Sequence, residues 1–234
     1  MARAKERDVN ESDTVTYVTD MLEQVFGFDK YTDITREFSI QGTYCDLAIR
    51  TGKRVECLIE VKAIGIKLNS KHLRQVVNYA AQQGVNWIVL TNGLQWQIHR
   101  VNVEGRVRNE LLVAYDFTDI NARKKEQQEL LYLLCKRGVQ KDLIDDYYEY
   151  KQSVNQYTVG ALLLTDSVTN LVRKELRKLK TVKVTADEIR ELLKNEVIKR
   201  DVLDSDDGIE AGKQLKKMMR KKERAGKGTK PKDG

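Results

Sequence analysis

The sequence predicts an α/β domain, with a mixed central sheet flanked by helices, followed by an all-helical region. In the first half of the chain, short apolar segments stand between glycine-containing turns, as strands do. After Asp119, apolar residues recur only at helical spacing. We therefore expect an α/β domain at residues 1–119, a helical region at 120–204 and a basic disordered tail at 205–234.

The α/β domain should begin with a helix at Glu11–Phe26, which Asn10 or Ser12 can cap and Gly27 ends. Strand-like segments and one further helix follow it. The Asn92-Gly93 pair predicts a hairpin turn. The expected order is strands Ile34–Ile40, Thr43–Arg50 and Val55–Lys62, a helix from Asn69 to Gln83, strands Trp87–Thr91 and Leu94–Val101, and an edge strand Leu111–Phe117, with turns at Gln41-Gly42 and Thr51-Gly52-Lys53.

The helical region should contain four helices. Gly138 suits the end of the first, and Thr185 with Glu188 forms a capping box at the start of the last. The expected helices are Ala122–Arg137, Lys141–Gln152, Thr158–Leu179 and Ala186–Leu203.

Charge is distributed unevenly along the chain. The net charge is +7, but Lys213–Gly234 alone holds ten Lys or Arg and two acids, a local +8, which leaves about −1 for residues 1–212. Such a segment has too few apolar residues to bury a core. We expect the tail either to contact phosphates without reading bases or to be a solvated extension that aids solubility.

Composition excludes several classes of protein. No apolar run approaches the roughly 20 residues that span a bilayer, and residues 1–10 lack the apolar stretch of a signal peptide. We therefore expect a cytoplasmic protein without membrane contact. Three cysteines without CxxC spacing, Cys45, Cys57 and Cys135, indicate reduced core thiols. Only two histidines are present, too few for a zinc cluster and a poor basis for a histidine-based triad.

Three charged residues stand in apolar strand sequences. Strand side chains alternate between two faces, so Glu60 and Lys62 project together from the end of a mostly apolar strand. Asp46 lies in the preceding apolar strand, and a hairpin would bring it beside Glu60. Buried charges require a partner or a metal. Two carboxylates with a backbone carbonyl suit Mg²⁺, and the Lys62 ammonium could orient a metal-bound water, although a structural ion-pair network would use the same residues.

The pattern Asp46, thirteen residues, Glu60-Val61-Lys62 resembles the PD-(D/E)xK nucleases, with Cys45 where the family name has proline. The likeness extends to the N-terminal nuclease domain of type I restriction enzyme R subunits and covers about residues 10–117. It implies a restriction-endonuclease-like core, with Asp46 and Glu60 as metal ligands and Mg²⁺, which Mn²⁺ can replace, as cofactor. Further segments that carry it are Asn10–Thr14, Gln75–Tyr79 and Leu90–Trp96.

The family usually adds an acid from the first helix, for which Glu11 and Glu23 compete. Glu11 extends the buried stripe of that helix toward the sheet and is the favoured candidate. Gln75 and Tyr79, four residues apart on one helix face, match the family's QxxxY motif, which supports the site and touches nucleic acid.

The resemblance implies a metal-dependent endonuclease that acts on nucleic acid, with DNA favoured, in a restriction or defence system. No GxxxxGK[ST] loop is present in the sequence. Either a separate motor or specificity protein would supply translocation and sequence choice, or the nuclease would act without them. The helices at 120–204 could form a homo-oligomer, dock a partner or bind DNA. The alternative is a catalytically idle module that binds nucleic acid or a partner.

Overall fold

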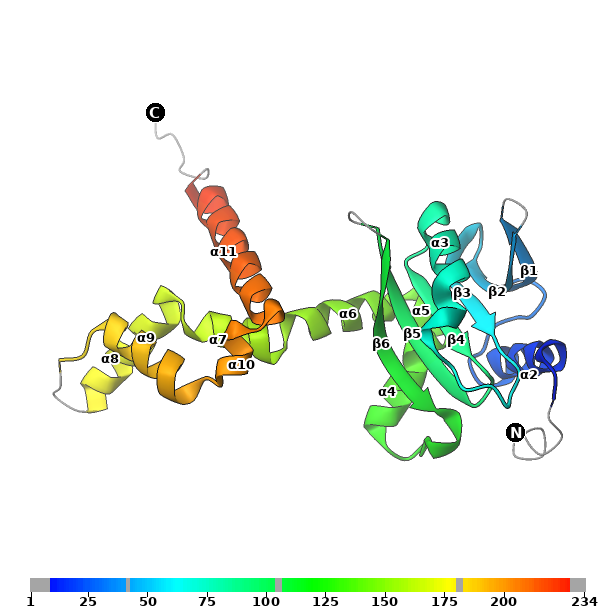
Figure 1. The fold of residues 1–234 in the computed structure, drawn as a ribbon, viewed down its shortest axis with the longest axis horizontal. Coiled ribbons are helices and arrows are strands. Elements are labelled where there is room, and N and C mark those ends of the chain that lie inside the picture. Colours follow the sequence, from blue (N-terminus) through cyan, green and yellow to red (C-terminus); the bar gives the residue numbers. More distant parts are fainter. Residues whose placement is uncertain (1–8, 41–42, 104–106, 180–182, 228–234) are drawn as a thin grey trace. The chain divides into compact units, whose positions relative to one another are not determined.

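Six strands form one sheet in the first half of the chain, as a computed structural model of the protein shows (Figure 1). The strands follow sequence order, and all neighbours are antiparallel except β3 and β4, which are parallel. The sheet is therefore mixed, and the predicted α/β class is confirmed. The strands are β1 Ile34–Ile40, β2 Thr43–Thr51, β3 Arg54–Val61, β4 Trp87–Thr91, β5 Gln95–Asn102 and β6 Arg108–Asp116. The structure describes residues 9–40, 43–103, 107–179 and 183–227, and among them the side chains of all but residues 39, 40, 43 and 222–227.

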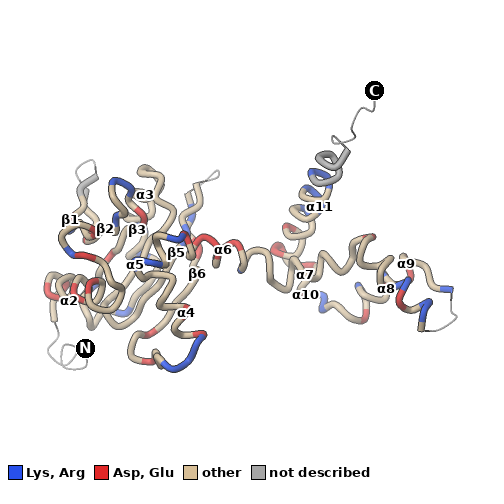
Figure 2. The backbone as a smooth tube through the Cα atoms, turned by 180° about the vertical axis from the view of Figure 1, so that it is seen from behind, with Lys and Arg blue, Asp and Glu red and all other residues tan. Residues whose placement is uncertain are grey.

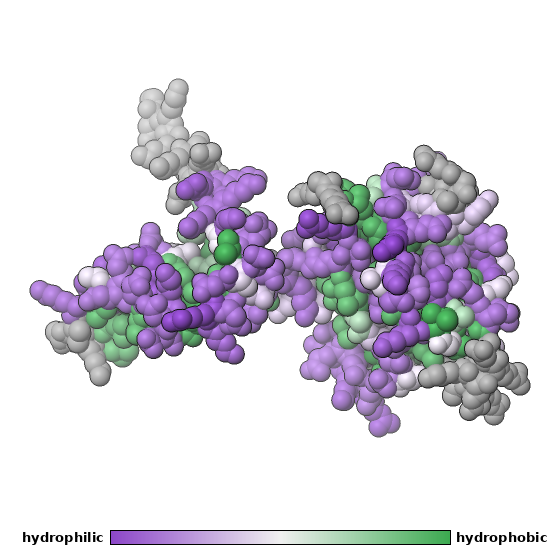
Figure 3. All heavy atoms as spheres, viewed as in Figure 1, coloured by the Kyte–Doolittle hydropathy of each residue, from purple (hydrophilic) through white to green (hydrophobic). Residues whose placement is uncertain are grey.

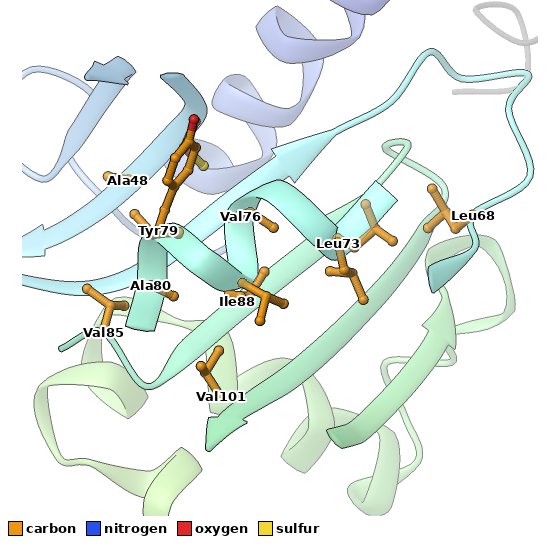
Figure 4. Packing of buried hydrophobic residues seen from close by; sticks show 13 residues of the cluster. Ala48, Leu68, Leu73, Val76, Tyr79, Ala80, Val85, Ile88 and Val101 are labelled. Carbon is orange, nitrogen blue, oxygen red and sulfur yellow. The ribbon is translucent and has the colours of Figure 1, made fainter. Parts of the chain in front are cut away.

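One face of the sheet is covered by α3 (Arg74–Gln83), which follows the 3₁₀ turn η1 (Ser70–Leu73). The inner side of this helix is apolar, and its side chains interdigitate with those of the central strands (Figure 4). Burial of this surface fixes α3 against the sheet. The packed residues include Leu73, Val76, Val77, Tyr79 and Ala80 of the helix segment and Ala48, Leu58, Ile88, Leu90 and Val101 of the strands.

The other face of the sheet is covered by α2 (Glu11–Gln24), α4 (Lys125–Leu134) and α5 (Lys136–Gln140). Phe26, just after α2, places its ring 5.2 Å from that of the fully buried Trp96. On the same face, the apolar side chains of α4 and α5 meet those of the central strands. Leu134 and Val139 line one hollow with Cys57 and Trp87.

Helix ends follow the expected local chemistry. The Asn10 side chain accepts a hydrogen bond from the Asp13 N–H at 2.8 Å and caps α2. Asn69 caps η1 in the same way, and Gly84, at φ 66°, ends α3 in the left-handed region that glycine tolerates. The predicted turn at residues 41–42 lies outside the described residues.

The α/β unit extends beyond the predicted boundary at residue 119. The chain divides into two compact units, Met1–Asp146 and Tyr147–Gly234. The start of α6 (Leu143–Ser153) belongs to the first unit, because Asp145 accepts hydrogen bonds from Trp87 Nε1 at 3.2 Å and from Arg100 at 2.6 Å. These contacts join residues far apart in the sequence, so helical periodicity could not reveal them.

The first predicted helix of the helical region, residues 122–137, is in fact two helices. The chain turns at Cys135, which has extended backbone angles, and the Cys135 sulfur accepts a hydrogen bond from the Gly138 N–H at 3.3 Å. Gly138 therefore lies inside α5 and does not end a helix. A Cβ atom at this position would lie 1.9 Å from the Tyr132 carbonyl oxygen, so glycine is needed for close approach.

The second unit is helical, as predicted, but its helices are shorter than expected. The Thr185–Glu188 capping box is confirmed. The expected helix at 158–179 is interrupted near Thr165. The Thr165 hydroxyl donates to the Leu162 carbonyl at 2.7 Å and so competes with the backbone hydrogen bonds of the helix. The elements are α7 Gln156–Leu163, α8 Asp166–Leu179, α9 Ala186–Leu192, the π-helical turn η3 Leu193–Val197, α10 Arg200–Asp204 and α11 Asp206–Lys227.

The predicted disordered tail at 205–234 is wrong for most of its length, because α11 occupies residues 206–227. Ala211, Leu215 and Met219 recur every four residues and are half-buried, while the lysines between them face solvent. Leu215 and Met219 line a hollow with Ala161 of α7. The charge count concealed this apolar stripe, which is enough to hold a helix against a neighbour.

Apolar side chains also reach the surface of the second unit (Figure 3). On α8, Leu171 and Leu179 are exposed. The described residues contain no helix with the length and hydropathy of a membrane span.

We expect Leu134→Ala to lower the free energy of unfolding by about 2–5 kcal/mol, because it leaves a cavity where α4 packs on the sheet. Leu134 is 1% exposed, whereas the control residue Leu111 is 50% exposed, so Leu111→Ala should change stability by about 0.5 kcal/mol or less. Trp87 and Trp96, the only tryptophans of the chain, both lie in this unit, and their fluorescence in a urea titration reports its unfolding. Equal effects of the two substitutions would place α4 outside the domain.

Candidate active site

The end of β3 carries the expected pair of charged residues. Lys62 Nζ lies 2.8 Å from Glu60 Oε1, and both side chains are 18% exposed. The Lys62 N–H donates to the Thr91 carbonyl at 2.8 Å, so the residue just beyond β3 remains attached to β4. The backbone that presents Lys62 is thus held by the parallel pairing of two buried strands.

Asp46 reaches the same point from β2. The antiparallel pairing of Leu47 with Ile59 brings Asp46 next to the end of β3, as the hairpin prediction required. Its Oδ2 accepts a hydrogen bond from the Val61 N–H at 2.7 Å. This bond fixes the Asp46 carboxylate against the backbone between Glu60 and Lys62.

The first helix contributes Glu11 to the cluster. Glu11 Oε1 lies 3.2 Å from Lys62 Nζ, and its side chain is 49% exposed. Glu23, the competing acid, instead pairs with Lys30 at 3.0 Å. The structure therefore brings Glu11, and not Glu23, to the ammonium group of Lys62.

Gln75 and Tyr79 are joined across one turn of α3. Gln75 Nε2 donates to the Tyr79 hydroxyl at 2.9 Å. The Tyr79 ring is buried in the same cluster as Ala48 and Leu58, which lie on β2 and β3 two residues from Asp46 and Glu60. Figure 4 shows Tyr79 beside Ala48. The pair thus connects the outer surface of α3 with the strands that carry the cluster.

Burial makes the two carboxylates weaker acids than free ones. It is the largest influence on the pKa of Asp46, which lies above its ordinary value although the Val61 N–H and Lys62 act in the opposite direction. Burial also raises the pKa of Glu60, and the negative charges of Asp46 and Glu11 add to that rise, while Lys62 opposes it. One ammonium group therefore does not fully offset the carboxylates.

The pKa of Lys62 is also raised, but by its acidic neighbours and not by burial. Burial alone lowers its pKa, but the Glu60 hydrogen bond and the charges of Glu60, Glu11 and Asp46 together raise it above the ordinary value. The side chain is therefore a cation at neutral pH. The neighbouring Cys45 thiol is held neutral, because burial and the charges of Glu60 and Asp46 raise its pKa to about 12.

The donor chemistry of the cluster fits a hard divalent cation. Asp46 and Glu60 offer carboxylate oxygens at one place, and their burial disfavours the charged forms unless a cation compensates them. Among the described residues, no group of three or more His, Cys, Asp or Glu side chains is arranged to hold a metal. Mg²⁺ needs only one or two carboxylates because it retains several waters, so this set is sufficient for it.

Other candidate residues take structural roles. The ring of His72 accepts a hydrogen bond from the Asn69 N–H at 3.4 Å and completes the cap of η1. The fully buried Trp96 donates to the Gly93 carbonyl at 3.3 Å, as expected for core packing. The Val61 N–H that fixes Asp46 and the Thr91 carbonyl that fixes Lys62 could not be predicted from the sequence, because both are backbone groups.

Comparison with protein families finds a match in the α/β unit. Residues 16–113 match the family described as type I restriction enzyme R protein N terminus. The match contains Asp46, Glu60, Lys62, Gln75 and Tyr79, whereas Glu11 lies before its start. Comparison with curated proteins and with solved structures gave no match. The resemblance expected from the motifs is confirmed: residues 16–113 are similar to the N terminus of type I restriction enzyme R proteins, and this similarity suggests a role of the nuclease or restriction type.

Proposed function

We propose that this protein is a metal-dependent endonuclease that hydrolyses phosphodiester bonds of DNA in a restriction or defence system. The observation that carries the proposal is the meeting of Asp46, Glu60 and Lys62 at the ends of paired strands, inside a domain similar to the N terminus of type I restriction enzyme R proteins. A half-buried cluster of acids around a single ammonium group suits phosphoryl chemistry.

The carboxylates of Asp46 and Glu60 would hold Mg²⁺, or Mn²⁺ in its place. When bound, the ion lowers the pKa of a water ligand and stabilises negative charge on the phosphate. The contribution of the chain is to fix the carboxylates: Val61 holds Asp46 by its N–H, and the strand pairing of β3 with β2 and β4 holds Glu60.

Lys62 would place a positive charge beside the attacking water and the reacting phosphate. The acids around Lys62 keep the ammonium group protonated, and Glu11, 3.2 Å away, restrains its position from the helix side. The Gln75–Tyr79 pair would support the same strands from α3 and offer the exposed Gln75 amide to the substrate.

The restriction context also suggests partners. The matched family is named for a subunit of a type I restriction enzyme, so we propose that this chain works on nucleic acid with separate motor or specificity proteins. The exposed apolar side chains of α8 offer a surface for such a partner or for a second copy of the chain.

We expect Lys62→Ala to reduce metal-dependent cleavage by roughly 10²–10³-fold or more, because the charge beside the reacting phosphate is lost. The matched control is Lys53→Ala, at an exposed lysine of the β2–β3 turn, which should cleave as the wild type does. Cleavage of duplex DNA, single-stranded DNA and RNA should be compared in Mg²⁺, in Mn²⁺ and in EDTA.

The outcomes of that panel distinguish a nuclease from a catalytically idle binding module and test the role of Lys62. Wild-type cleavage in Mg²⁺ but not in EDTA, lost in Lys62→Ala, supports the nuclease. Binding of nucleic acid without cleavage of any substrate would identify an idle binding module. Activity of Lys62→Ala equal to that of Lys53→Ala would remove Lys62 from the site.

We expect Glu11→Ala to impair cleavage more than Glu23→Ala does. Both substitutions remove an acid from α2 and break one ion pair, but only the Glu11 pair involves Lys62. Rates of cleavage under single-turnover conditions measure the difference. Equal losses, or a greater loss for Glu23→Ala, would show that the helix acid does not act through Lys62.

A further inference from the structure

A long stretch of the chain that borders the site has no acidic residues. Between Glu60 and Glu104 the sequence contains no Asp or Glu, although 35 of its 234 residues are acids. Its Lys and Arg residues are Lys62, Lys67, Lys71, Arg74 and Arg100. Lys62 belongs to the cluster and Arg100 pairs with Asp145, which leaves three cations on the segment that leads into α3.

These three residues, Lys67, Lys71 and Arg74, are called the α3 track here. All three side chains are exposed, and in the part of the chain that the structure describes none of them forms an ion pair. Gln75 and Asn78, which follow on the outer surface of α3, are exposed hydrogen-bond donors. The surface therefore offers positive charge and hydrogen-bond donors, and the segment that carries it contributes no carboxylate of its own. Asp116 of β6 lines a hollow with Lys67, but the two side chains form no ion pair.

The packing of α3 makes this surface rigid. Leu73, Val76 and Ala80 of the same segment are buried against the sheet, so the outward direction of the polar residues is fixed. The Gln75–Tyr79 hydrogen bond joins this outer surface to the strands of the cluster. A molecule bound along the α3 track would thus lie next to the candidate site.

The other helix at the site has the opposite charge. α2 contains Glu11, Asp13, Asp20 and Glu23 and no Lys or Arg. Figure 2 shows acids along α2 and basic residues at α3. A polyanion is repelled from the first helix and attracted to the second, so the charge pattern gives the site an approach side.

We propose that the α3 track binds the phosphate backbone of the nucleic-acid substrate without reading its sequence, and so sets the side from which the strand enters the site. The proposal rests on the proposed function for the reaction at the site. Exposed lysines often serve only solubility. The absence of acids from the segment between Glu60 and Glu104, and of ion pairs at the three cations of the α3 track among the described residues, is what points to a polyanion beside a cluster suited to phosphate chemistry.

The test measures binding rather than cleavage. The triple variant Lys67→Gln, Lys71→Gln, Arg74→Gln removes the α3 track and retains side chains of similar length. The matched control is Arg123→Gln, Lys124→Gln, Lys125→Gln, which removes three exposed cations at the start of α4. In both Figure 1 and Figure 2, α3 and α4 lie at opposite ends of the α/β unit.

Affinity for a duplex DNA of arbitrary sequence is measured in EDTA at several salt concentrations. The full chain is used, so any contribution of α11 and the residues after it is the same in every variant. Each neutralised phosphate adds about −0.9 to the slope of log affinity against log salt, so the α3 track variant should flatten the slope by about 2.7. The control should keep the wild-type slope, and thermal unfolding of each variant verifies folding.

Loss of slope in the α3 track variant alone supports the proposal. An unchanged slope, an equal change in the control, or a wild-type chain that binds no DNA overturns it. If the triple variant does not fold, Lys71→Gln and Arg74→Gln should each remove about 0.9 from the slope. Because EDTA prevents metal-dependent cleavage, failure of this proposal and failure of the proposed reaction give different results.

Discussion

At the end of β3 the single ammonium group of Lys62 must compensate the negative charge of several carboxylates, and much of the α/β unit is arranged to meet this constraint. Lys62 contacts Glu60 and Glu11, and Asp46 is held beside them by the Val61 N–H. Partly buried carboxylates are unfavourable unless charges or hydrogen bonds compensate them. The cluster forms only if β2 and β3 pair in one register and α2 begins at the correct place.

The fold satisfies this constraint through ordinary packing. The parallel pair β3–β4 lies between antiparallel neighbours, and helices cover both faces. The apolar side chains of α3 and of α2, α4 and α5 bury those faces. The charged cluster is thus placed at the edge of a rigid core, where burial is sufficient to raise the pKa values of Asp46 and Glu60 without removing them from solvent. Such a position combines fixed geometry with access for a substrate.

Elements with a strong local signal could be predicted from the sequence. The strand periods, the Asn10 and Asn69 caps and the Thr185 capping box all occur as expected, because each depends on residues within a few positions of one another. The end of the α/β unit, expected at residue 119, and the helix at residues 206–227, expected to be disordered, could not be predicted correctly from local sequence. Asp145 is fixed by residues of β4 and β5, and α11 by its contacts in the hollow that Ala161 lines.

In the candidate site, too, features that depend on nearby residues could be predicted, and features that depend on distant parts of the chain could not. Alternation along β3 predicted that Glu60 and Lys62 point together, and the hairpin predicted Asp46 beside them. Helical spacing favoured Glu11 over Glu23 without excluding either. What the sequence could not provide is the set of backbone partners, the Val61 N–H and the Thr91 carbonyl, that hold the charged residues in place. Backbone groups are the same at every position, so only the structure identifies them.

We propose that the cluster binds a cation for function and does not exist to stabilise the fold. Burial raises the pKa of Glu60 even though Lys62 opposes the rise. A carboxyl group with a raised pKa in the folded state contributes stability below its unfolded pKa and loses it as the pH rises through the folded pKa. Because the pKa of Glu60 is raised, ionisation of this carboxyl group disfavours folding, and replacement by neutral glutamine should not harm stability at pH 7.

The most direct measurement compares the thermal unfolding midpoints of the wild type and Glu60→Gln at pH 7, in EDTA and in Mg²⁺. We expect the variant to be at least as stable as the wild type in EDTA, and Mg²⁺ to raise the midpoint of the wild type alone, because an ion that binds only the folded state stabilises it. A variant less stable than the wild type in EDTA, with no effect of Mg²⁺ on either protein, would instead identify Asp46, Glu60 and Lys62 as a structural ion-pair network.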